Sequence, residues 1–130
     1  FLMGHGVPEN FTGAIREHGA THAIFVDAAA LGTGVPPGTS RLIPRDSIGG
    51  TALATHGMPL TLLCEFLERS AGVQTYVLGI QAPDMFAREL DDETWERMRS
   101  AVAATCAALR SLDAISLDAM PPAGAGNGEE

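Results

Sequence analysis

The sequence predicts one α/β domain, built as a three-layer α/β/α sandwich with a mostly parallel central sheet. Short, nearly all-apolar runs alternate with longer runs of helical period, as expected where helices cover both faces of a parallel sheet. The chain has 130 residues, which is enough for one hydrophobic core but not for two. Its apolar fraction of 45% and charged fraction of 18% are those of an ordinary globular domain.

The first predicted elements are a helix and a strand. After a short glycine-bearing loop, Asn10 is placed to cap a helix that ends at Gly19. Residues 22–26 are almost entirely apolar, which is typical of a strand covered on both faces. Asp27 ends this strand.

The middle of the chain predicts a loop, an edge strand and a second helix. Glycines and prolines make residues 32–38 a turn-rich loop. Residues 40–44 form a strand at a sheet edge, because the final proline cannot donate a ladder hydrogen bond. Residues 45–56 are irregular, and Pro59 then opens a helix that ends at Gly72.

The last strand and helix have the clearest patterns. Residues 73–80 form a strand, and Gln81 follows its end. Asp91 caps a final helix with apolar residues at steps of three or four. We expect this apolar stripe, which includes Trp95, to pack in the core.

Charge and composition argue against several classes of partner. Lys and Arg number 8 against 16 Asp and Glu, and the resulting net charge of −8 disfavours nucleic acid and anionic membrane surfaces. No apolar run approaches the ~20 residues that span a bilayer. The start of the chain does not read as a signal peptide, and the two cysteines lack a CxxC spacing. We therefore expect a cytoplasmic protein with reduced, buried thiols.

Three polar side chains are expected at one edge of the sheet. Asp27 and Gln81 follow the ends of two strands, and His56 precedes a helix. Right-handed crossovers bring such loops to the same edge, where α/β folds bind ligands. A carboxylate and an imidazole suit a borderline divalent metal such as nickel or zinc, although a tight site needs a third ligand. The plainer interpretation is a turn residue at Asp27 and a surface histidine at His56.

Four short motifs add to this spacing. They are a strand end with Asp27, a Pro-Gly loop, a helix entry with His56 and a strand end with Gln81. In sequence they read Ile24-Phe25-Val26-Asp27-Ala28, Pro37-Gly38, Thr55-His56-Gly57-Met58-Pro59-Leu60 and Leu78-Gly79-Ile80-Gln81.

In this order the motifs resemble those of the nickel-iron hydrogenase maturation endopeptidases, and most closely the branch that processes formate-hydrogenlyase-type hydrogenases. The resemblance implies an aspartic-type endopeptidase that removes a C-terminal extension from the hydrogenase large-subunit precursor after nickel insertion. Nickel carried by the substrate is the recognition signal. The resemblance also implies that Asp27 and His56 contact this metal and that Gly6 and Gln81 contact the substrate. It leaves the attacking group open.

The resemblance covers about residues 4–112, with two departures from the family pattern. The family's opening Gly-Asn-x-x-x-x-Asp-Asp-Gly stretch, which carries an acidic metal ligand, has no counterpart here. We therefore expect the first strand and helix to be missing and the fragment to be inactive alone. The family also has Pro directly after Gln, whereas here Ala82 separates Gln81 from a proline.

The domain organisation and two other functional hypotheses complete these expectations. Residues 1–112 form the domain, incomplete at its N-terminus, and residues 113–130 form a disordered, acidic, Pro/Gly-rich tail. The first alternative is a non-catalytic α/β module that binds a metal or a partner. The second is a doubly wound domain for a small ligand, although the chain has no Gly-x-Gly-x-x-Gly or Walker-type loop to support it.

Overall fold

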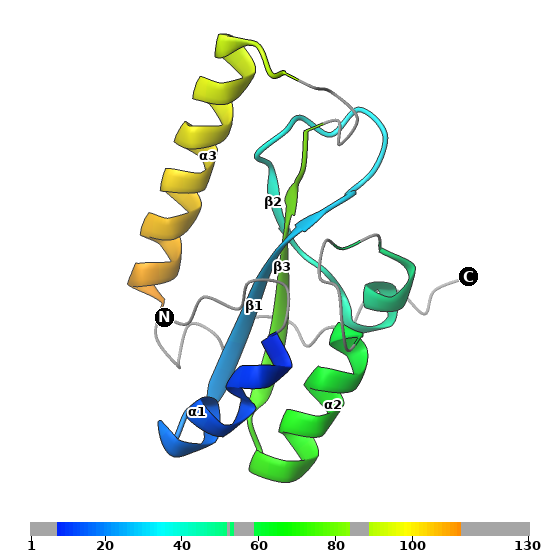
Figure 1. The fold of residues 1–130 in the computed structure, drawn as a ribbon, viewed down its shortest axis with the longest axis vertical. Coiled ribbons are helices and arrows are strands. Elements are labelled where there is room, and N and C mark those ends of the chain that lie inside the picture. Colours follow the sequence, from blue (N-terminus) through cyan, green and yellow to red (C-terminus); the bar gives the residue numbers. More distant parts are fainter. Residues whose placement is uncertain (1–7, 52, 54–58, 84–88, 113–130) are drawn as a thin grey trace, which may run out of the picture.

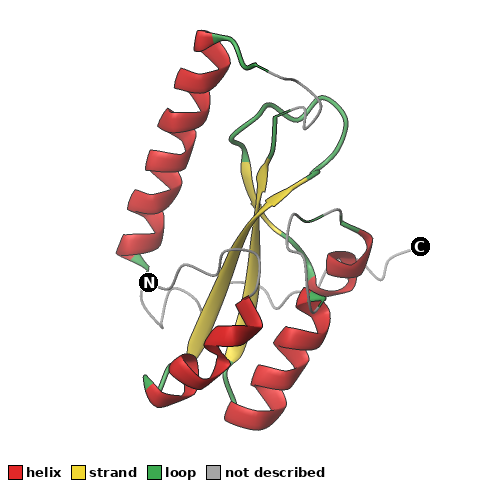
Figure 2. Cartoon of the chain, viewed as in Figure 1, coloured by secondary structure: helices red, strands yellow, loops and turns green. Residues whose placement is uncertain are grey.

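The protein is a layered α/β domain in which the sheet lies between α3 and α2 (Figure 1; Figure 2 colours the same view by secondary structure). The computed structural model describes residues 8–51, 53, 59–83 and 89–112. The elements in chain order are η1 (Pro8–Phe11), α1 (Thr12–Glu17), β1 (His22–Ala29), β2 (Ser40–Leu42), η2 (Arg45–Gly50), α2 (Leu60–Ala71), β3 (Gln74–Gln81) and α3 (Asp92–Ser111).

The sheet is built around β3. Its strand order within the described residues is β1-β3-β2. β1 and β3 pair in parallel from His22 opposite Gln74 to Ala29 opposite Gln81. β2 runs antiparallel to β3 at the edge of this sheet, so the predicted edge position is confirmed. The longer pairing is parallel, as predicted from the apolar strands.

The hydrophobic core lies between the sheet and α2. Apolar residues at helical spacing on α2 face the sheet, and the helix ends at Gly72, whose φ of 65° places it in the left-handed region. Both the apolar spacing and the stop at Gly72 were predicted. The buried residues of the core are Ala29, Ile43, Ile48, Leu60, Leu63, Cys64, Leu67, Val73 and Val77.

The strand ends lie later in the sequence than predicted. β1 does not end at Asp27 but continues to Ala29, because residues 27–29 keep their parallel pairing with residues 79–81. Gln81 is accordingly the last residue of β3 and not the first of a loop. Tertiary pairing, which leaves no local signal, decides both boundaries.

Two local predictions on the helices were wrong. Asn10 lies inside η1, and α1 instead follows Phe11 without a side-chain capping hydrogen bond. The segment predicted to be irregular contains η2, where the backbone N–H of Ser47 donates to the carbonyl of Pro44 at 2.9 Å. A 3-10 turn of this kind satisfies the backbone without the longer apolar period of an α-helix.

α3 begins as predicted but packs differently. The carboxylate of Asp91 accepts a hydrogen bond from the backbone N–H of Thr94 at 2.8 Å, which caps the helix. No residue of α3 is buried, and Trp95 is 46% exposed, so the expected core packing of its stripe was wrong. The helix meets the body at Gly38, where an added β-carbon would lie 2.9 Å from the Cβ of Ala101. None of the helices within the described ranges has the length and apolar content needed to cross a bilayer.

Candidate functional site

Asp27 lies near the carboxyl end of β1, on the face of the sheet that α2 covers. It shares this face with Ala29, which is buried in the core, because side chains alternate along a strand. The Oδ1 atom of Asp27 accepts a hydrogen bond from the backbone N–H of Ala28 at 2.9 Å. The side chain is half-buried. The carboxylate is therefore held at the rim of the core by a rigid strand.

Gly79 lies opposite Asp27 in the parallel ladder. A β-carbon at this glycine would lie 2.8 Å from Ile43 Cδ1, 2.9 Å from Ala29 Cβ and 3.0 Å from Leu31 Cδ2. Only glycine at position 79 therefore lets the side chains of Leu31, after β1, and Ile43, after β2, pack directly against β3. Sequence reasoning missed this role, although an isolated glycine inside a strand is a recognised sign of close approach.

Gln81 holds both ends of the loop at residues 30–39. Its backbone N–H donates to the carbonyl of Thr39 at 2.8 Å, and its own carbonyl accepts from the N–H of Gly38 at 2.9 Å. Its side-chain Oε1 accepts from the backbone N–H of Leu31 at 2.7 Å, and its Nε2 donates to the carbonyl of Ala82 at 3.0 Å. The substrate contact predicted for Gln81 stays a prediction.

Between η2 and α2, Leu53 lies at the end of β1. Leu53 forms an isolated antiparallel bridge with Ala29, two residues beyond Asp27. Leu60, the first residue of α2, is buried in the core on the same face. Leu53 and Leu60, which precede and follow His56 in the sequence, thus lie beside β1 and in the core over the sheet.

The structure describes two of the four predicted site residues, Asp27 and Gln81. Asp27 and Gln81 share one face at the carboxyl edge, because Asp27 pairs with Gly79 and Gln81 pairs with Ala29. This confirms that the two strand ends meet. His56 and Gly6 lie outside the described residues, so their predicted contacts are not tested. In the part of the chain that is described, no three His, Cys, Asp or Glu side chains gather closely enough to hold a metal ion.

An ion pair ties η2 to α2 behind this site. The guanidinium of Arg45 contacts the carboxylate of Glu68, and Thr75 donates to the same carboxylate at 2.7 Å. Burial raises the pKa of Glu68, but the hydrogen bonds from Arg45 and Thr75 and the charge of Arg45 together hold that pKa below its ordinary value. The network holds the start of η2 against α2 and β3, eight residues before Leu53 in the sequence.

Cys64 is not a candidate nucleophile. Its side chain is buried in the core under η2, and burial raises the pKa of the thiol. A thiol that stays protonated in an apolar setting is inert, because the thiolate is the reactive form. This agrees with the predicted role as a small hydrophobic residue.

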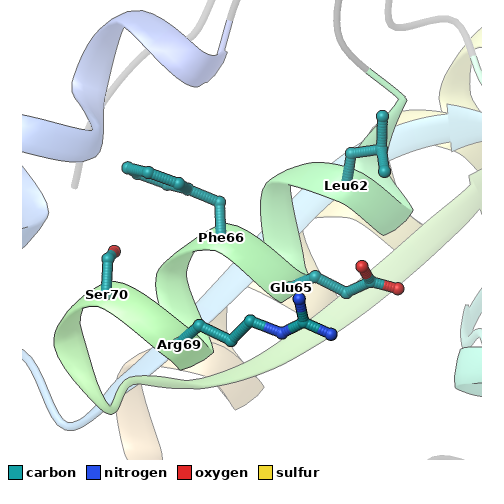
Figure 3. Close-up of a pocket in the computed structure, with 5 residues that line it drawn as sticks. All are labelled: Leu62, Glu65, Phe66, Arg69 and Ser70. Atoms are coloured by element: carbon teal, nitrogen blue, oxygen red, sulfur yellow. The ribbon is translucent and has the colours of Figure 1, made fainter.

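A hollow of about 360 Å³ lies on the outer face of α2, away from the strand ends. Figure 3 shows that its lining side chains all project from this one helix. Leu62 and Phe66 are exposed there, whereas the neighbouring Leu63 and Leu67 point into the core. The hollow holds no residue of the predicted site, so it is not the candidate active site.

Comparison with known proteins supports the family suggested by the motifs. The chain is 40% identical to the hydrogenase 3 maturation protease of Escherichia coli over 85 aligned residues. This alignment covers 65% of this chain and 52% of that protein. The chain is related to the hydrogenase maturation proteases. No protein-family profile matches it. The chain spans about half the length of the curated relatives it matches, 47% and 52%.

Solved structures of hydrogenase maturation proteases share this fold. The endopeptidase HycI from Escherichia coli superposes with a TM-score of 0.55 at 32% identity, over 78% of this chain and 65% of that one. The NiFe hydrogenase maturation protease HycI from Thermococcus kodakarensis superposes with a TM-score of 0.51 at 26% identity, over 75% of this chain and 62% of that one. The predicted α/β class is thereby confirmed.

Proposed function

We propose that this protein is an endopeptidase that matures a nickel-iron hydrogenase. It removes a C-terminal extension from the large-subunit precursor once nickel has been inserted. The observation that carries the proposal is the bridge between Leu53 and Ala29. It brings Leu53, three residues before His56 in the sequence, beside the strand that carries Asp27. The names of the related proteins favour this enzyme over a non-catalytic binding module.

The chemistry of Asp27 and His56 suits a metal that arrives with the substrate. A carboxylate and a neutral imidazole are both ligands for borderline divalent ions such as nickel. Two protein ligands alone bind weakly, so the protein engages the precursor firmly only when nickel completes the bridge between them. Selectivity for the nickel-loaded precursor is then a difference in affinity between two forms of one substrate.

The attack on the peptide bond is assigned to water, which adds to the scissile carbonyl carbon as the C–N bond breaks and the amine leaves with a proton. The substrate's nickel would polarise either that water or the carbonyl. The aspartic-type assignment rests on the motif around Asp27, and the cytoplasm is the proposed place of the reaction. His56 must be deprotonated to bind the metal. Recognition therefore weakens as the pH falls through the pKa range of histidine.

The test is a trimming assay with the full-length protein and purified large-subunit precursor. The wild-type protein shortens the nickel-loaded precursor, seen by mass spectrometry, and leaves the nickel-free precursor intact. Asp27→Asn and His56→Ala each slow trimming by about tenfold or more, as expected when a metal-binding group is lost. Asp46→Asn, which changes an exposed carboxylate of η2, is the matched control. Wild-type rates in both site variants would refute the assignment.

A further inference from the structure

We propose that Gln81 is a positioning residue: its carboxamide fixes the near end of the loop at residues 30–39, and this loop receives an extended peptide segment of the substrate through its backbone. The identity of that substrate rests on the proposed function. The inference changes the role predicted for Gln81 from direct contact with substrate to support of the element that makes the contact.

The first argument is that one residue anchors the loop at both ends by different atoms. The near end, Leu31, is bound by the side-chain Oε1 of Gln81 at 2.7 Å. The far end, Gly38 and Thr39, is bound by the backbone of Gln81 at 2.9 and 2.8 Å. A change of side chain therefore removes the hydrogen bond at the near end and leaves the two hydrogen bonds at the far end in place.

The second argument is that the far end has another support. Gly38 has a φ of 87° and packs against α3, where an added β-carbon would lie 2.9 Å from Ala101 Cβ and 3.2 Å from Met98 Cα. The near end instead contains Gly32, which has a φ of 136° and is exposed. The side chain of Leu31 packs against the core, and the carboxamide of Gln81 adds the hydrogen bond that fixes the Leu31 backbone where the loop leaves β1.

The third argument is the chemistry of the loop. Residues 28–40 contain no charged side chain, and Gly32, Thr33, Gly34 and Pro36 are exposed. Small residues leave the backbone N–H and C=O groups of the loop accessible to another chain. Such a surface recognises the backbone of an extended peptide, with little demand for charge on that peptide. It adjoins Asp27, so a peptide held there lies beside the proposed metal contact.

The experiment compares Gln81→Met with Gln74→Met in the full-length protein. Methionine matches glutamine in size but lacks the acceptor oxygen for Leu31. Gln74 is an exposed glutamine at the opposite end of β3, so it is the matched control. Gln81→Glu keeps an acceptor oxygen and serves as the conservative variant, and thermal unfolding of each variant confirms that it folds.

Two measurements decide the outcome. In Gln81→Met, amide hydrogen exchange at Leu31 rises about tenfold or more, the effect of losing one part-buried hydrogen bond, whereas exchange at Gly38 changes by less than about threefold. In the trimming assay, KM for the nickel-loaded precursor rises by about tenfold while kcat changes by less than about threefold. Gln81→Glu restores Leu31 protection and most of the KM, and Gln74→Met resembles wild type.

Two results would overturn the inference. A raised KM with unchanged Leu31 exchange means that Gln81 contacts the substrate directly. Faster Leu31 exchange with unchanged KM means that the loop does not receive the peptide. If the wild-type protein trims no precursor, the proposed function fails instead. The exchange rates then still test the positioning claim, which unchanged Leu31 exchange refutes.

Discussion

Glu68 on α2 forms an ion pair with Arg45 on η2 and accepts a hydrogen bond from Thr75 at 2.7 Å. One carboxylate thus joins a helix, a 3-10 turn and the central strand. Burial opposes the charge on Arg45, but the hydrogen bond to Glu68 and the nearby negative charges together raise the pKa of the guanidinium. The pair remains charged throughout the neutral range, so its strength depends on the titration of Glu68 alone.

Glu68→Gln is expected to destabilise the protein at neutral pH but not in acid. The folded-state pKa of Glu68 lies below its ordinary value, so its stabilisation is present above that ordinary value and disappears as the pH falls through the lowered one. The side chain is 36% exposed, so we expect less than about 1 kcal/mol. Urea unfolding at pH 7 and pH 3 measures this, with Glu65→Gln as the control. A difference that grows on acidification would contradict the prediction.

Gly79→Ala is expected to destabilise the fold by about 1–3 kcal/mol, the usual cost of an overpacked core. The new methyl group would lie 2.9 Å from Ala29 Cβ, which has no rotamer through which to move away. Gly49→Ala is the control, because a β-carbon there meets nothing within 4 Å. Thermal and urea unfolding compare the two variants. Equal stability would show that the strands separate easily at this point.

Asp91→Ala is expected to loosen the first turn of α3, whereas Asp91→Asn preserves it. The backbone N–H of Thr94 donates to the Asp91 carboxylate and lowers its pKa. The charged cap is therefore effective above the ordinary carboxyl pKa and weakens as the pH falls through the lowered value. Asparagine also caps helices but does not titrate. Amide exchange at Thr94 measures the effect, and identical protection in wild type and Asp91→Ala would refute it.

The two thiols are expected to differ in reactivity. Cys64 is buried and its thiol pKa is raised by that burial, whereas Cys106 is half-buried on α3. Iodoacetamide at pH 8 should therefore label Cys106 first and reach Cys64 only after urea is added. Mass spectrometry of the labelled peptides gives both rates, and the Cys106→Ser variant isolates Cys64. Comparable rates in the native protein would contradict the buried position.

The elements with a local chemical signal could be predicted from the sequence. Gly72 stops α2 because glycine takes the left-handed conformation readily, and Asp91 caps α3 because its carboxylate reaches the N–H of Thr94. The ends of β1 and β3 carry no such local signal. Asp27 belongs to the sheet because it pairs with β3, and Gln81 belongs to it because it pairs with β1. Trp95 fits the apolar spacing of α3, but apolar spacing along a helix does not show whether another element of the fold covers that side of the helix.

The sequence predicts which strand ends form the candidate site, but not the contacts that hold the neighbouring loops in place. Parallel topology alone predicts Asp27 and Gln81 at one edge, and in the structure their side chains also lie on the same face of the sheet. The hydrogen bond from Leu31 to Gln81 joins residues fifty positions apart, and no local pattern encodes it. The bridge between Leu53 and Ala29 is of the same kind. Contacts distant in sequence thus determine how the site is held.

α3 buries none of its side chains completely, yet Met98 and Ala101 press against Gly38. A helix without a buried side chain opens at a lower free energy than the core, so we expect its amides to exchange as a separate unit. Each opening removes the packing of α3 on Gly38 and leaves the far half of the loop held by the backbone of Gln81 and by the pairing of β2 with β3. Docking of an outer helix thereby sets how often the loop beside Asp27 is fully supported on both sides.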